Sequence, residues 1–235
     1  MSQVLIDLSQ DSKLPAAWYH IGSQKMLDEI IEDIPVKEVF LPQILTCLEQ
    51  IHNLIKATST HNLPTGLHLG RVGRLGALIA QKAGLEWKER LECLYGGWIH
   101  DVGKIYIPEH VLNKPGRLTP EEYELIKGHV SYGCELLKDY PHLQPFVDPV
   151  KYHHERWDGN GYPHGLKGLD IPVTGRVIAL ADAYDAITSF RPYPPYQRTH
   201  EEAIIEIKRC GGAHFDPYLA EVFCKIPQNE IENTL

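Results

Sequence analysis

Residues 66–83 have the sequence GLHLGRVGRLGALIAQKA, and they lie between Pro64 and Gly84. Proline is tolerated in the first turn of a helix and glycine is typical just past the last turn, so this segment predicts one long helix. Helical periodicity recurs along the chain, whereas the alternation that is typical of strands is scarce. We therefore predict an all-α fold, in which residues 4–8 are the one short extended piece.

The neighbouring segments carry the same helical pattern. Apolar residues recur at steps of three and four over residues 39–57, which indicates one buried helical stripe. Thr119 and Glu122 have the spacing of a capping box, and Pro120 suits the first helical position, so a helix should begin there. Further helices are expected at residues 86–103, 143–153, 172–190, 199–210 and 217–225.

The composition is that of a soluble globular protein, with 43% hydrophobic and 23% charged residues in 235. No window approaches the roughly 18–20 apolar residues that span a bilayer, and the N-terminus lacks a secretory signal. We therefore expect a cytoplasmic protein that has no membrane partner. The five cysteines form no Cys-x-x-Cys pair, which argues against a structural zinc site and a disulfide framework.

The net charge is −8, and the chain has no run of Lys or Arg. A protein that grips polymeric nucleic acid needs a basic surface, so such a partner is not expected. An anionic ligand would need a local positive site, such as bound metal ions.

The segment WIHDVGK, residues 98–104, places His100 beside Asp101 at a predicted helix end. Imidazole nitrogen and carboxylate oxygen both bind iron, manganese or zinc. The dipeptide alone is more typical of a helix end that uses its histidine as a dipole partner. Asp182, however, lies in the apolar helix segment IALADAYDAI, where a carboxylate must be paired or bound to metal. The combination indicates a metal site.

Four further histidines could add ligands to this site. His68 and His129, each taken alone, are more typical of core or surface histidines than of ligands. His153 and His154 are adjacent at a predicted helix end, where both rings can turn toward one centre.

Taken in order, these motifs resemble the HD-GYP branch of the HD-domain metal-dependent phosphohydrolases, over about residues 67–223. The resemblance is carried by HLGRVGRLGALIA, HDVGKIYIPEHVLNKPGRLTPEEYELIKGH, HHERWDGNGYPHGLKGLDIP, RVIALADAYDAITS and RPY. It implies an HD-domain-like helical bundle with the C-terminal extension of that branch. It also implies a phosphodiesterase that uses a metal-bridging hydroxide to hydrolyse a bacterial cyclic dinucleotide. Cyclic di-GMP is the favoured substrate, and cyclic GMP-AMP is the alternative.

The resemblance also implies the site residues. Two divalent ions, iron or manganese, are expected to be bridged by Asp101. Lys104 is expected to contact a phosphate oxygen, and Asp185, one turn after Asp182, to orient Lys104 or a ligand. Tyr162 and Arg191 are expected to contact the nucleotide. The full set of expected metal ligands is His68, His100, Asp101, His129, His153, His154 and Asp182.

The chain departs from the family pattern at two places. Pro64 stands where some members carry a glutamate for a third metal, so we expect a binuclear site and a linear dinucleotide as the main product. Pro194 and Pro195 replace a basic residue that usually follows Arg191, which favours weaker binding or a broader tolerance for a mixed cyclic dinucleotide.

Three units are expected along the chain: an N-terminal extension at residues 1–62 that packs on the core, a catalytic domain at 63–226 and a C-terminal tail at 227–235. Residues 155–158 are interpreted as loop scaffold. Two other functions stay open, namely a catalytically weak receptor that signals through a protein partner and another HD-type nucleotidohydrolase that uses one metal. A homodimer also stays open.

Overall fold

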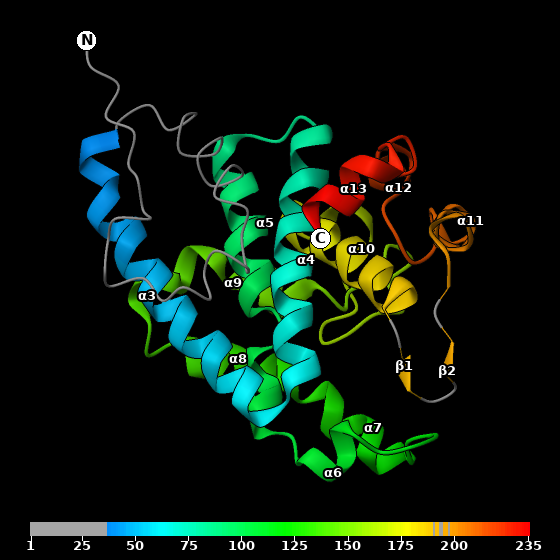
Figure 1. The fold of residues 1–235 in the computed structure, drawn as a ribbon, viewed down its shortest axis with the longest axis horizontal. Helices are drawn as coiled ribbons and strands as arrows, with labels where there is room; N and C mark the ends of the chain where they lie inside the picture. Colours follow the sequence, from blue (N-terminus) through cyan, green and yellow to red (C-terminus); the bar gives the residue numbers. More distant parts are fainter. Residues whose placement is uncertain (1–36, 190, 193–194, 197) are drawn as a thin grey trace.

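The computed structural model describes residues 37–189, 191–192, 195–196 and 198–235. The extended piece expected at residues 4–8 lies outside this part of the chain. The described part is helical, which confirms the all-α prediction, except for two short strands (Figure 1). These strands, β1 (Arg191–Pro192) and β2 (Pro195–Tyr196), pair antiparallel in the proline-rich segment that was expected only to end a helix.

Helix α4 (Leu63–Lys82) packs against α3 (Lys37–His61), α5 (Trp87–Ile99) and α10 (Val173–Thr188) (Figure 1). It begins as predicted near Pro64, where the Asn62 side chain accepts a hydrogen bond from the Thr65 amide at 3.1 Å. Its fully buried side chains face two apolar clusters. Leu69 joins the cluster with α3 and α5, and Leu75 joins the cluster with α10 and the C-terminal helices.

Two glycines allow α4 and α5 to lie unusually close. A Cβ atom on Gly97 would lie 2.5 Å from the Cα of Gly73, and one on Gly73 would lie 2.3 Å from the Trp98 ring. Real Cβ contacts of that length do not occur, so a larger residue would separate the helices. The close approach matters because α4 carries His68 and the end of α5 leads directly into His100.

The next segments run alongside this helix pair. The 3-10 helix η2 (Val102–Tyr106) passes so near to α8 (His129–Leu137) that a Cβ on Gly103 would lie 1.9 Å from the His129 carbonyl oxygen. Between them lie α6 (Glu109–Leu112) and α7 (Pro120–Lys127). Helix α7 begins with the predicted capping box, in which Thr119 and Glu122 each accept a hydrogen bond from the other's backbone amide.

Two predicted helix boundaries are wrong. The helix expected to reach Gly103 ends at Ile99, because the chain turns into η2 to pack against α8. The helix expected at residues 143–153 is divided into η3 (Pro141–Phe146) and α9 (Val147–Tyr152), in a segment where Pro145 and Pro149 lack the amide hydrogens of a continuous helix.

Three C-terminal helices pack against α4 and α10, namely α11 (His200–Cys210), α12 (Pro217–Phe223) and α13 (Gln228–Thr234). The short η4 (Gly168–Asp170) precedes α10. Helix α13 lies within the residues expected to form a tail, and it packs on α4 with Ile231 fully buried. Among the described helices, none combines the length and the apolar character that a membrane span requires.

The contact between α4 and α5 yields a stability prediction. Gly97→Ala should lower the free energy of unfolding by about 1–3 kcal/mol, because its methyl group must displace the Gly73 backbone rather than a flexible side chain. Chemical denaturation measures the change. Gly211→Ala is the matched control, since its Cβ would meet atoms no closer than 3.4 Å. Equal stability of the two variants would contradict the close contact.

Candidate metal centre

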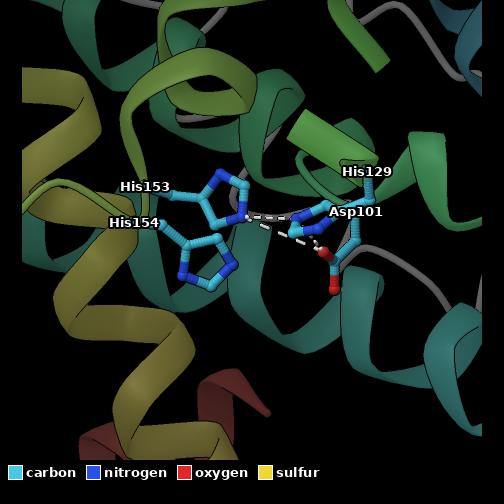
Figure 2. A group of neighbouring side chains, drawn as sticks. All are labelled: Asp101, His129, His153 and His154. Atoms are coloured by element: carbon cyan, nitrogen blue, oxygen red, sulfur yellow. Dashed lines mark hydrogen bonds and ion pairs between the residues drawn. The ribbon is translucent and has the colours of Figure 1, made fainter. Parts of the chain in front are cut away.

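The predicted ligands come from five segments of the chain and converge on Asp101. All of them except Asp182 fall into two groups, and the potential ligand atoms within each group lie within 4.8 Å of one another. Asp182 lies outside both groups, with its Oδ1 atom 3.0 Å from His68 Nε2. Figure 2 shows the first group with its side chains directed toward one another. Because Asp101 belongs to both groups, its carboxylate is placed to bridge two sites. The groups are Asp101, His129, His153 and His154, and His68, His100 and Asp101.

Three of the histidine rings are oriented by backbone carbonyls of the preceding turn of the chain. The Nδ1 atoms of His100, His129 and His153 each lie 2.6–2.9 Å from a backbone carbonyl oxygen three or four residues earlier. A carbonyl oxygen only accepts, so Nδ1 carries the hydrogen. In the neutral rings, each Nε2 therefore presents a lone pair, which is the form that binds a metal ion.

These lone pairs face other electron-rich atoms at short range. The Nε2 atoms of His129 and His153 lie 3.3 Å apart, and His129 Nε2 lies 3.1 Å from an Asp101 oxygen (Figure 2). His100 is completely buried, and its Nε2 has no hydrogen-bond partner among the described residues. Buried acceptors that face one another are unfavourable unless a cation lies among them. The residues therefore fit a metal centre.

His68 is oriented differently, by a carboxylate. Its Nδ1 lies 2.7 Å from Asp185 Oδ2, and its Nε2 lies 3.0 Å from Asp182 Oδ1. Burial lowers the pKa of His68, but the hydrogen bonds to Asp182 and Asp185 outweigh burial and raise the pKa to about 9. A metal ion at Nε2 would therefore replace a proton, whereas the hydrogen at Nδ1 could remain there and stay hydrogen-bonded to Asp185.

The remaining charges also suit metal binding. Burial, followed by the neighbouring histidines, lowers the pKa of His153 well below its ordinary value, and burial lowers the pKa of His154 to about 3. Both rings are therefore neutral near pH 7. Burial acts to raise the pKa of Asp101, but Lys104 and the surrounding histidines hold it well below its ordinary range. The centre thus combines the ionised carboxylate of Asp101 with the neutral imidazoles of His153 and His154.

The other predicted site residues lie around this centre. Lys104 donates a hydrogen bond to Asp101, whereas Asp185 contacts His68 and not Lys104. The Tyr162 ring stacks on His154 with a centroid distance of 4.6 Å and an interplanar angle of 22°. Arg191 begins strand β1, directly after α10, and its side chain lies outside the described structure.

Two residues outside the predicted site support this arrangement: Arg71, which the sequence did not reveal, and Glu155, one of the residues interpreted as loop scaffold. Arg71 donates two hydrogen bonds to Asp185. Its position three residues after His68, on the same helix face, was the available signal. Glu155 is only 2% exposed and accepts hydrogen bonds from the backbone amides of His164 and Leu166 at 2.7 and 2.9 Å. Glu155 therefore holds the loop that presents Tyr162.

Comparison with known proteins identifies relatives of this chain. The profile described as HD domain matches residues 49–219. The cyclic di-GMP phosphodiesterase of Thermotoga maritima is 39% identical over 191 residues, which cover 80% of this chain and 50% of that protein. The 3'3'-cGAMP-specific phosphodiesterase 2 of Vibrio cholerae is 37% identical over 180 residues, which cover 75% of this chain and 34% of that protein.

A solved structure of a cyclic GMP-AMP specific phosphodiesterase from V. cholerae has the same fold. It matches with a TM-score of 0.56 and 20% identity, over 79% of this chain and 52% of that chain. The present chain thus spans about half the length, or less, of the curated relatives named above.

The orientation of His129 yields a metal-binding prediction. His129→Ala removes an Nε2 atom that faces both Asp101 and His153, so manganese affinity should fall by at least the roughly 10–100-fold that loss of an outer-shell partner causes. Elemental analysis after equilibration with manganese measures the bound metal. The exposed His110 supplies the matched control, because His110→Ala should bind as much metal as the wild type. Unchanged metal content in both variants would rule out His129 as a ligand.

Proposed function

The chain belongs to the HD domain family, and we propose that it is a metal-dependent phosphodiesterase that hydrolyses a bacterial cyclic dinucleotide. Membership of the family was predicted from the motifs and is confirmed by the profile match. Relatives named as cyclic di-GMP and 3'3'-cGAMP phosphodiesterases support the reaction class. The observation that carries the proposal is the convergence of two groups of ligand atoms on the buried carboxylate of Asp101.

The proposed cofactor is a pair of divalent ions, iron or manganese. A ligand set rich in histidine, with carboxylate oxygens, suits these metals. One ion would be held by His68, His100 and Asp182, the other by His129, His153 and His154, with Asp101 shared between them. When bound, such ions supply an activated water at neutral pH and neutralise charge on the phosphodiester.

Lys104 is the residue proposed to bind the scissile phosphate. Its ammonium group is partly exposed and lies against Asp101, so a phosphate that approaches the centre meets this cation. Asp185 is proposed to act through His68, because the Asp185 carboxylate accepts a hydrogen bond from His68 Nδ1. Lys104 would thus act on the substrate, and Asp185 on a proposed metal ligand.

Tyr162 and Arg191 are proposed to recognise the rest of the nucleotide. The stacking of Tyr162 on His154 brings its ring next to the metal ligands, within reach of a nucleotide whose phosphate binds there. Arg191 follows the C-terminal end of α10, the helix that carries Asp182. Pro194 and Pro195 supply no second cation, which favours tolerance for cyclic GMP-AMP beside cyclic di-GMP.

Turnover with added manganese or iron tests the reaction. The wild type should hydrolyse cyclic di-GMP, and Lys104→Ala should lower kcat/KM by about 10²–10³-fold, because a positioned donor to the developing phosphate charge is lost. Lys138→Ala is the matched control, since Lys138 forms an exposed pair with Glu135. Cyclic GMP-AMP assayed in parallel ranks the two substrates.

The same assay separates the alternatives. A wild type that binds cyclic di-GMP with its metals in place, but does not cleave it, would be a receptor. Cleavage that survives His129→Ala would favour an HD-type nucleotidohydrolase that works around one metal.

Pro64 yields a prediction about the product. It lies in the first turn of α4, four residues before His68, and its side chain has no ligating atom. With two metals only, the linear dinucleotide should accumulate as the main product, which chromatography of the reaction resolves. Accumulation of GMP without a linear intermediate would contradict this expectation.

A further inference from the structure

Arg71 lies on α4, one turn after His68. Two nitrogen atoms of its guanidinium group donate hydrogen bonds to the carboxylate of Asp185. Its Nε lies 2.5 Å from Asp185 Oδ1, and its Nη2 lies 2.9 Å from Asp185 Oδ2. Asp185 comes from α10 and is only 2% exposed. A bidentate contact of this kind fixes the plane of the carboxylate as well as its charge.

Ser189 completes the network at the end of α10. Its hydroxyl donates to Asp185 Oδ2 at 3.1 Å and accepts from Arg71 Nη2 at 3.1 Å. The same Oδ2 atom accepts the hydrogen on His68 Nδ1 at 2.7 Å. Asp185 therefore receives hydrogen bonds from three side chains, and its remaining freedom to rotate is small.

The direction of His68 depends on this carboxylate. With Nδ1 bound to Asp185, Nε2 faces Asp182 Oδ1 at 3.0 Å and Asp101 Oδ2 at 3.8 Å. We propose that Arg71 is a positioning residue for the half of the metal centre that contains His68. It holds Asp185 in the one orientation that aims His68 Nε2 at the metal.

This inference rests on the proposed pair of metals. It predicts that the two metal sites differ in their dependence on Arg71. His129 and His153 donate their Nδ1 hydrogens to backbone carbonyls. The main chain fixes the position of these carbonyls, so they need no support from another side chain. His68 instead depends on the chain of contacts through Asp185 to Arg71. Loss of Arg71 should therefore weaken one metal site and spare the other.

The test is a titration of the metal-free full chain with manganese(II) chloride, with free manganese counted by electron paramagnetic resonance. The wild type should bind two equivalents. In Arg71→Gln, one equivalent should bind about 10–100-fold more weakly, and the other should be nearly unchanged. Arg71→Lys should fall between the wild type and Arg71→Gln, because lysine restores the charge but not the planar fork.

Arg209 provides the matched control. It forms the same bidentate contact with Glu206, at 2.9 and 2.5 Å, on the exposed face of α11. Arg209→Gln should leave both manganese affinities unchanged. Thermal unfolding without metal shows whether each variant is folded, and the rise in Tm on adding manganese should shrink for Arg71→Gln only.

Two outcomes would overturn the role of Arg71: unchanged affinities, or equal weakening of both equivalents. The proposed function fails on a separate measurement, namely a wild type that does not turn over cyclic dinucleotide. If the wild type bound one equivalent only, the proposed pair of metals would fail. The role of Arg71 would then survive only if Arg71→Gln weakened that equivalent.

Discussion

The burial of one carboxylate, that of Asp101, is the constraint around which the rest of this structure is organised. A buried charge is very unfavourable unless partners compensate it. Here the compensation comes from Lys104 and from histidines that lie on helices distant in sequence. The glycine contacts between α4 and α5, and between η2 and α8, are what bring those helices near enough. The close packing of the backbone is therefore what allows the candidate metal-binding side chains to meet.

His68 is oriented by a different kind of group from the rings of His100, His129 and His153. One set of rings is oriented by backbone carbonyls, which are as rigid as the helices that carry them. His68 lies in the second turn of α4, where the carbonyls of the preceding turn are already used by the helix, so a carboxylate from α10 takes their place. A carboxylate on a side chain needs support of its own, and Arg71 and Ser189 supply it.

The loop that carries Tyr162 connects the centre to the C-terminal helices. The buried Glu155 binds two backbone amides within the loop, and the Trp157 amide donates to the His214 carbonyl at 3.0 Å. Arg176 lies over the Trp157 ring and pairs with Asp216. The C-terminal helices therefore do more than cover apolar surface, because they also hold the loop whose Tyr162 stacks on His154.

The sequence by itself determined the helical class, the start of most helices and the types of residue that could bind metal, because caps, prolines and apolar periodicity act over a few neighbouring residues. It could not place the end of α5 or the packing of α13, since these depend on contacts between distant segments. It also could not assign Asp185 to His68, or reveal Arg71. Which nitrogen of each ring faces the centre was decided only by the tertiary structure, because that choice depends on the carbonyl or carboxylate that packing brings to the other nitrogen.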